Sequence, residues 1–417
     1  MKKNLKRIIG VSGAFLIILG TISCSNQGQL QIKVENTDNQ PYTDDPVVIK
    51  RTDLQDKLKI TNDGQSVLVV NFKGDTIPSQ VDDTNGDGHW DELFFISDFD
   101  SIQSKTFFLS VVPEKEMPEF TQRTNVRFAS IYDNKFVPQD TATRIKGTDT
   151  EVTQQYFQVE GPAWENDKVG FRNYFDERNG FDIFGKRTTE MVMNMVGTGK
   201  SYHELQPWGM DILKVGNSLG AGGIAIDYKD SLYNFAPGAV GTYQLLSAGP
   251  LRSVFKLSFT NIHIGDQTMA LDQVISIIAG EYGYHSKVTV TGFKDSVSLA
   301  AGIVNMHSDT LYFTDNNDKF VSIATHDKQA FLGEYLGMGL IFNKKDFVKY
   351  GETPDTGTGI IQTYYGDLQL SGEEPVDFMF MTGWEYTDKQ FANREYFLTT
   401  IAKQAAKMAH PVKVSFE

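Results

Sequence analysis

The stretch from Glu160 to Gly223 holds the residue types best suited to chemistry, because aromatic, acidic and basic side chains are interleaved there at high density. An indole face stacks on the C–H face of a pyranose ring, while neighbouring charged groups hydrogen-bond the hydroxyls. The segment therefore predicts a saccharide-binding site. The candidate substrate-binding residues are Trp164, Arg172, Asp176, Arg178, Lys186, Trp208 and, further along the chain, Trp384.

The same segment contains groups that can carry protons. A carboxylate next to a histidine or a tyrosine can perform acid–base catalysis on a sugar. The predicted catalytic residues are His203, Tyr202, Glu165 and Asp211. His203 or Tyr202 would act as the base or the acid, and Glu165 or Asp211 would orient it.

Two reactions fit these residues. In a lyase, the local arginines or Lys186 would neutralise the carboxylate of a uronate sugar before the base removes the adjacent proton. In a hydrolase, two carboxylates would share the work, with Glu165 paired with Asp176 or Asp211. The predicted partner is therefore a saccharide, and an acidic, uronate-containing one for either reaction.

Three other interpretations stay open. Trp164 and Trp208 could fill the core, with the charges forming a solvated rim. The protein could bind a glycan without a reaction, in which case the tryptophans would lie flat on an open sheet face. It could also be a mutarotase-like epimerase, which needs a Glu and a His facing one free sugar.

A second motif, from Val81 to Leu93, has the oxygen spacing of the first part of an EF-hand calcium loop. Counted from Asp83, oxygen-bearing side chains occupy positions one, three, five and nine, and Gly88 allows a sharp turn at position six. Position twelve is Phe94 instead of a bidentate Glu. The predicted ligands of a structural Ca²⁺ are Asp83, Asn85, Asp87, Asp91 and the backbone carbonyl of His89. The alternative is an Asx-rich turn without an ion, and no organic cofactor is predicted.

The N-terminus predicts export. A basic start precedes an apolar run at 8–23, and the only cysteine, Cys24, follows at once. A cysteine at the cleavage point resembles the lipobox of bacterial lipoproteins, in which that residue is acylated; the alternative is an ordinary signal peptide with an incidental cysteine. We expect a protein of the bacterial cell envelope, periplasmic or at the outer-membrane surface, that contacts the membrane only through a lipid on Cys24.

Composition excludes several classes of protein. The 417 residues include 39 Lys and Arg against 53 Asp and Glu, a net charge of −14, and no basic block, which argues against nucleic acid as a partner. One cysteine cannot form an internal disulfide. The net charge does not exclude an anionic sugar, because the predicted site carries its own arginines.

Short alternating strands separated by turns predict a mainly β fold without a βαβ rhythm. We expect a signal peptide at 1–24, a small β-sandwich with the calcium-like loop at 25–112, and a large antiparallel β-sandwich with the sugar site at 119–417. The polar, proline-bounded stretch between them predicts a linker. Helical spacing predicts one C-terminal helix at 388–409, capped by Thr387 or Asp388, with its apolar stripe packed on a sheet.

Several motifs carry a family resemblance. They are Gly161-Pro162-Ala163-Trp164-Glu165-Asn166-Asp167, Arg172-Asn173-Tyr174-Phe175-Asp176, Asp182-Ile183-Phe184-Gly185-Lys186, Tyr202-His203, Trp208-Gly209-Met210-Asp211 and Thr382-Gly383-Trp384-Glu385. With the calcium-like loop, this set resembles an uncharacterised bacterial lipoprotein family, the domain-of-unknown-function family four-eight-six-one. The resemblance implies a role in polysaccharide utilisation, often alongside uronate degradation. The large domain also resembles the galactose-mutarotase-like supersandwich, a fold that does not define a reaction.

Overall fold

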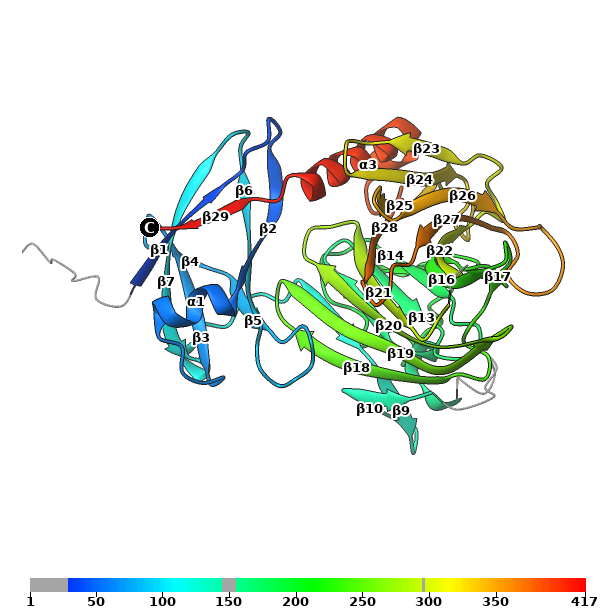
Figure 1. Ribbon diagram of the computed structural model, residues 1–417, viewed down its shortest axis with the longest axis horizontal. Helices are drawn as coiled ribbons and strands as arrows, with labels where there is room; N and C mark the ends of the chain where they lie inside the picture. Colours follow the sequence, from blue (N-terminus) through cyan, green and yellow to red (C-terminus); the bar gives the residue numbers. More distant parts are fainter. Residues whose placement is uncertain (1–28, 145–154, 295–296) are drawn as a thin grey trace, which may run out of the picture.

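The computed structural model describes residues 29–144, 155–294 and 297–417, and it consists of a small and a large β-sandwich (Figure 1). The predicted signal peptide and Cys24 lie outside the described residues. Within the described ranges, no helix is long and apolar enough to cross a membrane.

The small sandwich packs two antiparallel sheets around its own apolar core. The first sheet contains, in spatial order, β29 (Lys413–Phe416), β1 (Gln29–Glu35), β7 (Ser104–Pro113), β3 (Gln65–Asn71) and β4 (Thr76–Ile77). The second contains β2 (Tyr42–Lys50), β6 (Glu92–Phe99) and β5 (Ser79–Asp82). Helix α1 (Arg51–Leu58) follows β2 and buries Leu54 and Leu58.

The last strand departs from the predicted division of the chain. β29 pairs with β1, with Val414 opposite Val34, so the C-terminus completes the small sandwich (Figure 1). Two strands so far apart in sequence pair because the tertiary structure brings them together, and the residue pattern of either strand does not identify its partner.

The large sandwich places a nine-stranded sheet against two five-stranded sheets. The large sheet contains, in order, β11 (Thr141–Thr143), β18 (Val240–Ala248), β19 (Arg252–Ile264), β20 (Gln267–Ile278), β21 (Gly283–Thr291), β28 (Val376–Trp384), β25 (Leu336–Asn343), β24 (Phe320–Asp327) and β23 (Tyr312–Asp315). One smaller sheet contains β15 (Gly209–Asp211), β14 (Phe181–Lys186), β13 (Val169–Asn173), β12 (Ala163–Asn166) and β8 (Thr124–Arg127). The other contains β17 (Leu232–Tyr233), β16 (Ala221–Tyr228), β22 (Val297–Val304), β27 (Thr363–Gln369) and β26 (Phe347–Glu352).

Short elements complete the fold. They are the hairpin β9 (Ala129–Tyr132) and β10 (Lys135–Pro138), and the 3-10 turns η1 (Glu114–Glu116), η2 (Gln158–Glu160) and η3 (Lys389–Ala392). Paired strands are antiparallel throughout these sheets. The predicted mainly β fold with antiparallel sandwiches is confirmed.

The C-terminal helix begins later than the sequence pattern predicts. Helix α3 runs from Arg394 to Ala409, and Asn393 caps it by accepting a hydrogen bond from the backbone N–H of Tyr396 at 3.2 Å. Asp388 caps the preceding turn η3 instead. The buried stripe of α3 packs on Met379 and Met381 of β28, so the predicted packing on a sheet is confirmed.

Charged and polar side chains join the two sandwiches. The Nε of Arg252 on β19 donates to Asp82 of β5 at 2.7 Å, and its Nη2 donates to Glu92 of β6 at 2.8 Å. Arg123 bridges Asp44 and Asp167 in the same way. The calcium-like loop is therefore held against the large sheet at both of its ends, through Asp82 and Glu92.

Candidate functional site

Antiparallel pairing gathers the charged residues of the predicted site on one face of the sheet β15-β14-β13-β12-β8. Arg172 lies opposite Asp182, and Asp211 lies opposite Phe184. Opposed residues, and residues two apart on a strand, point to the same side of a sheet. The residues on this face are Glu165, Arg172, Asp182, Lys186 and Asp211. The alternate residues, such as Trp164 and Ile183, fill the core between the sheets.

Arg172 is the centre of the cluster and is only 2% exposed. Its Nη2 donates to Asp182 at 2.7 Å and to Asp211 at 2.9 Å. Its Nη1 donates to Glu160 at 3.1 Å and to the hydroxyl of Tyr202 at 3.1 Å. Its Nε donates to Asp182 as well. Every nitrogen of this guanidinium therefore has an acceptor inside the protein.

The carboxylates around Arg172 are crowded. Burial raises the pKa of Asp211 well above its usual value, the charge of Asp182 raises it further, and Arg172 opposes both effects. We therefore place a proton on Asp211. The cluster can hold and exchange that proton.

His203 connects this buried cluster to the solvent. Its Nδ1 lies 3.5 Å from Oδ2 of Asp211, and its side chain is 53% exposed. Burial lowers the pKa of His203 below its usual 6.5, and the charge of Arg172 lowers it further. The ring centroids of His203 and Tyr202 are 4.5 Å apart. A neutral imidazole next to a tyrosine ring provides two proton carriers in one place, one to accept a proton and one to donate it.

Arg178 is the exposed cation of the site. Its Nη2 donates to Asp176 at 2.6 Å and to Glu160 at 2.8 Å, and its side chain is 31% exposed. Its guanidinium lies 3.8 Å from the ring centroid of Tyr174. Glu160 thus bridges Arg178 to Arg172, because its two oxygens accept from one arginine each.

Glu165 and Lys186 form a separate, sealed pair. Lys186 Nζ lies 2.7 Å from Glu165, and both side chains are 0% exposed. The other bonds of Glu165 come from Asn125 and from the backbone N–H groups of Val192 and Met193. Among the described residues, Glu165 has no bond to His203 or Tyr202. The pair therefore anchors the 187–208 loop, which carries both of those residues, and it does not orient the base directly.

The tryptophans divide between core and surface. Trp164 is 0% exposed and is enclosed by aromatic rings that include Phe255 and Tyr284. Trp384 is 2% exposed and packs on Gly185, where a side chain would overlap its ring. Neither ring has a face open to a sugar, so the core-filling alternative describes Trp164 but not Trp208. Trp208 lies partly exposed on the 187–208 loop, so it is the tryptophan available for stacking.

Glu160 and Tyr174 also belong to the site, and neither is among the residues predicted from the sequence. Asp182 is one of the possible acids that the segment offers, but it is not among the predicted catalytic residues. Tyr174 follows Arg172 by two positions, so counting alternate positions from β13 would have found it. Glu160 carries no such signal, because it follows Val159 in a turn where both residues have positive φ, 47° and 67°. Such values are unusual for a β-branched residue and mark a backbone held by its surroundings. Arg172 holds it by donating to the carbonyl of Val159 at 3.4 Å.

The calcium-like loop is folded by its own side chains. Asp83 accepts from the backbone N–H groups of Gly86 at 2.6 Å and Gly88 at 2.8 Å. Asn85 and Asp87 each accept from the N–H two residues on, and Asp91 accepts from Thr84 and Asn85. Across the described ranges, no group of three or more His, Cys, Asp or Glu side chains is placed to hold a metal ion. The oxygens that would bind Ca²⁺ are present but now stabilise the turn.

Comparison with known proteins supports the family and the fold. The family model for a domain of unknown function, DUF4861, matches residues 34–414. The uncharacterized protein P7 of Formosa agariphila is 23% identical over 420 residues, which cover 95% of this chain and 96% of that protein.

Solved structures share the architecture at low sequence identity. An alpha-mannosidase from Enterococcus faecalis V583 has a TM-score of 0.50 and 10% identity, over 94% of this chain and 46% of its own. A glycosyl hydrolase family 38 protein from Enterococcus faecalis has a TM-score of 0.50 and 9% identity, over 94% and 48%. The chain thus spans about half the length of each of these structures.

Proposed function

The chain belongs to the DUF4861 family, and we propose that it is a carbohydrate-active protein that acts on a uronate-containing saccharide at the His203 cluster. The observation that carries the proposal is the contact of a half-exposed histidine with a buried carboxyl, 3.5 Å apart. This pair is connected to the cation Arg178 through Arg172 and Glu160. The fold shared with an alpha-mannosidase and a glycosyl hydrolase supports a saccharide as the ligand.

The roles follow from exposure and protonation. Arg178, the more exposed arginine, would neutralise the carboxylate of the substrate. His203 would take the proton from the carbon next to that carboxylate, since its lowered pKa keeps it neutral at neutral pH. Burial raises the pKa of Tyr202 even though Arg172 opposes this, so the phenol keeps its proton and can serve as the acid. Asp211 would orient His203.

The elimination balances with these groups and solvent water. The C–H electron pair becomes a carbon–carbon double bond, and the bond to the leaving glycosidic oxygen breaks. Tyr202 gives that oxygen its proton; His203, which is half-exposed, then releases the proton it took to water, and water returns a proton to Tyr202. The products are a shortened saccharide and an unsaturated uronate.

A lyase fits better than a hydrolase built on Glu165. A hydrolase needs two carboxyl groups that face the scissile bond, and Glu165 and Asp176 are both sealed against cations, at 0% and 1% exposure. Of Glu165, Asp176 and Asp211, it is Asp211 that adjoins a half-exposed proton carrier, His203.

The test is a screen of pectic and other uronate oligosaccharides, followed both by the ultraviolet absorbance of the unsaturated product and by a reducing-end assay. We expect signal in both assays. His203→Gln should lower the rate by about 10²–10⁴-fold, the usual contribution of an acid–base group, while His263→Gln, on the distant strand β19, should leave it unchanged.

Each other outcome selects a different function. Reducing ends without absorbance would mean hydrolysis, and binding without either product would mean a glycan-binding protein. Full activity in His203→Gln would remove His203 from the mechanism.

We also propose that the mature protein is anchored in the bacterial cell envelope by a lipid on Cys24. The support is the sequence pattern of the first 24 residues. Metabolic labelling with a fatty-acid analogue should mark the expressed protein, and Cys24→Ser should abolish the label. An unlabelled wild-type protein would contradict the proposal.

A further inference from the structure

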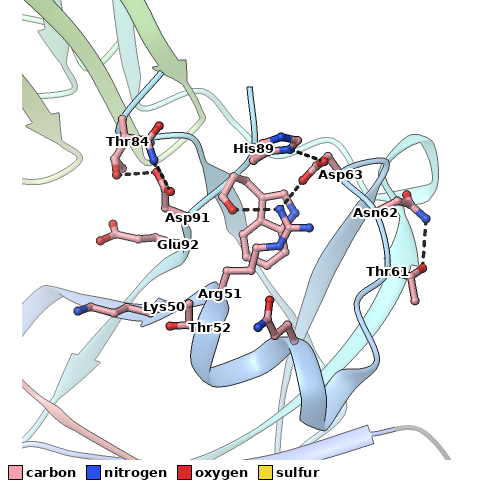
Figure 2. Close-up of a pocket in the computed structure, with 13 residues that line it drawn as sticks. Lys50, Arg51, Thr52, Thr61, Asn62, Asp63, Thr84, His89, Asp91 and Glu92 are labelled. Atoms are coloured by element: carbon pink, nitrogen blue, oxygen red, sulfur yellow. Dashed lines mark hydrogen bonds and ion pairs between the residues drawn. The ribbon is translucent and has the colours of Figure 1, made fainter. Parts of the chain in front are cut away.

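The small sandwich contains an open pocket of about 650 Å³ (Figure 2). Its walls are the start of α1, the turn at 61–63 and the end of the calcium-like loop. The lining residues that point into it include Arg51, Thr52, Asn62, Asp63, His89 and Asp91. Small-molecule sites usually have volumes of about 300–1,000 Å³, so the pocket has room for one or two sugar rings.

The floor of the pocket is held rigidly. The guanidinium of Arg51 lies 4.6 Å from the ring centroid of Trp90, which is 5% exposed. Trp90 Nε1 donates to the carbonyl of Gln65 at 3.2 Å. Arg51 also pairs with Asp63, whose other oxygen lies 2.7 Å from Nδ1 of His89 (Figure 2). These bonds fix the floor before any ligand arrives, which lowers the entropic cost of binding.

The charges that line the pocket are largely paired with one another. Asp63 is shared by Arg51 and His89, and Glu92 lies 2.8 Å from Arg252. Asp91 accepts from the backbone and hydroxyl of Thr84. Among the described residues, Lys50 is the one lining cation without an ion pair. A phosphate or a polyanion would find a single free charge here, which is too little for strong binding.

Uncharged hydrogen-bonding groups make up the rest of the wall. They are Thr52, Gln55, Thr61, Asn62, Thr84 and Asn85. Hydroxyls and amides offer donors and acceptors together. This mixture matches a ligand whose hydroxyls also donate and accept, and which carries no net charge.

We propose that this pocket is a second saccharide site, which binds a neutral mono- or disaccharide apart from the His203 cluster. All of its lining residues belong to 50–92, in the small sandwich, and none belongs to 160–211. The presence of the pocket follows from its geometry alone, whereas the identification of its ligand as a saccharide rests on the proposed function. The small sandwich would then hold the protein on a glycan while the large one acts on it.

The four tryptophans make the two sites separately visible. Trp90 lies in the pocket and Trp208 at the His203 cluster, while Trp164 and Trp384 are buried in the core. We would record the ¹H–¹⁵N indole signals of the labelled protein and assign them with Trp90→Phe and Trp208→Phe. The probes are glucose, galactose, mannose, xylose, rhamnose, cellobiose and maltose, each added alone, and digalacturonate.

We expect at least one neutral sugar to move the Trp90 signal in a saturable way, and digalacturonate to move Trp208. The double variant Gln55→Ala/Asn62→Ala should raise the Kd at Trp90 at least tenfold, because two polar contacts are lost. Asn39→Ala, exposed on the same sandwich outside the pocket, should leave it unchanged.

The outcomes separate the two proposals. If none of the neutral sugars moves Trp90, or if the double variant binds as the wild type does, the second site is overturned even when Trp208 responds. If Trp90 responds and Trp208 stays still with digalacturonate, the second site stands, and the proposed uronate site loses its support.

Discussion

Two arginines in this protein lie in clusters of similar composition, but one cluster is buried and the other is partly open to solvent. Arg172 lies 4.5 Å from the ring centroid of Tyr174, and Arg51 lies 4.6 Å from that of Trp90. Arg172 is buried and pairs with three carboxylates, whereas the side chain of Arg51 is 18% exposed and pairs with one. A buried charge must be matched completely by its neighbours, while water and salt screen a partly open one.

The acids of the two clusters have pKa shifts in opposite directions, because one cluster is buried and the other is partly open. In the buried cluster, desolvation raises the pKa of Asp211. In the open cluster, hydrogen bonds from Arg51 and His89 lower the pKa of Asp63. The buried cluster therefore stores a proton, and the open one remains an ion pair.

The largest expected effect is on the buried arginine. Arg172→Met leaves Glu160, Asp182 and Asp211 without their cation, so we expect a loss of about 3–5 kcal/mol in the free energy of unfolding. Urea denaturation followed by circular dichroism measures it. Arg178→Met, in the same network but 31% exposed, should cost clearly less. Equal stability of Arg172→Met and the wild type would contradict the inference that the buried carboxylates need this cation.

Calcium should stabilise the protein through the Asp83 loop, which adjoins the Arg51 cluster, and not through the Arg172 cluster. We propose that the Asp83 loop binds Ca²⁺ as a structural ion, with Asp83, Asn85, Asp87, Asp91 and the carbonyl of His89 as ligands. Calcium at about 100 times its Kd would then add about 2.7 kcal/mol of stability.

The measurement is thermal unfolding with calcium and with a chelator. Asp83→Ala should remove the difference in Tm, and Asp53→Asn, an exposed acid on α1, should retain it. An identical Tm with calcium and with chelator in the wild type would mean that the loop is an Asx turn without an ion.

The two acids should give pH dependences of opposite sign. The pKa of Asp211 is raised in the folded state, so its unfolded form ionises first as pH rises above 3.8, and folding stability falls by about 1.4 kcal/mol per pH unit until the folded pKa is reached. Asp211→Asn should remove that fall. The pKa of Asp63 is lowered, so its contribution is present above 3.8 and is lost on acidification. Stability curves of Asp211→Asn and Asp63→Asn with the same slope would contradict this assignment.

The smallest effect is expected at the open arginine. Arg51→Met keeps an apolar chain over Trp90 and loses a partly solvated ion pair, so it should cost about 1 kcal/mol or less. Urea denaturation of Arg51→Met and Arg172→Met gives the two losses in the free energy of unfolding, which can then be compared. A loss at Arg51 as large as that at Arg172 would show that exposure does not govern these clusters.

Local patterns were sufficient for much of the fold. Alternation in segments such as Phe255–Phe259 predicted antiparallel β-sandwiches, and helical spacing predicted α3, because both signals lie within a few residues. Helix α1 escaped prediction, since its eight residues bury only Leu54 and Leu58.

The sequence predicted which segment carries the candidate site, but it did not predict which of its residues contact one another. His203, Asp211 and Arg172 do meet, as the dense segment indicated. Glu165 binds Lys186 instead of the base. Composition shows which groups are near one another in sequence, but it does not show which oxygen meets which cation.

The β class, the C-terminal helix, the oxygen-rich loop and the segment of reactive residues could all be predicted from the chain, because each depends on short-range order along it. The burial of Trp164, the bridge that Glu160 makes between two arginines and the pairing of β29 with β1 depend on tertiary packing. The reason is physical. The free-energy cost of burying a charge depends on which distant segments cover it. The side of a strand that is buried depends on which sheet packs against it. Both are settled only when the sheets have packed.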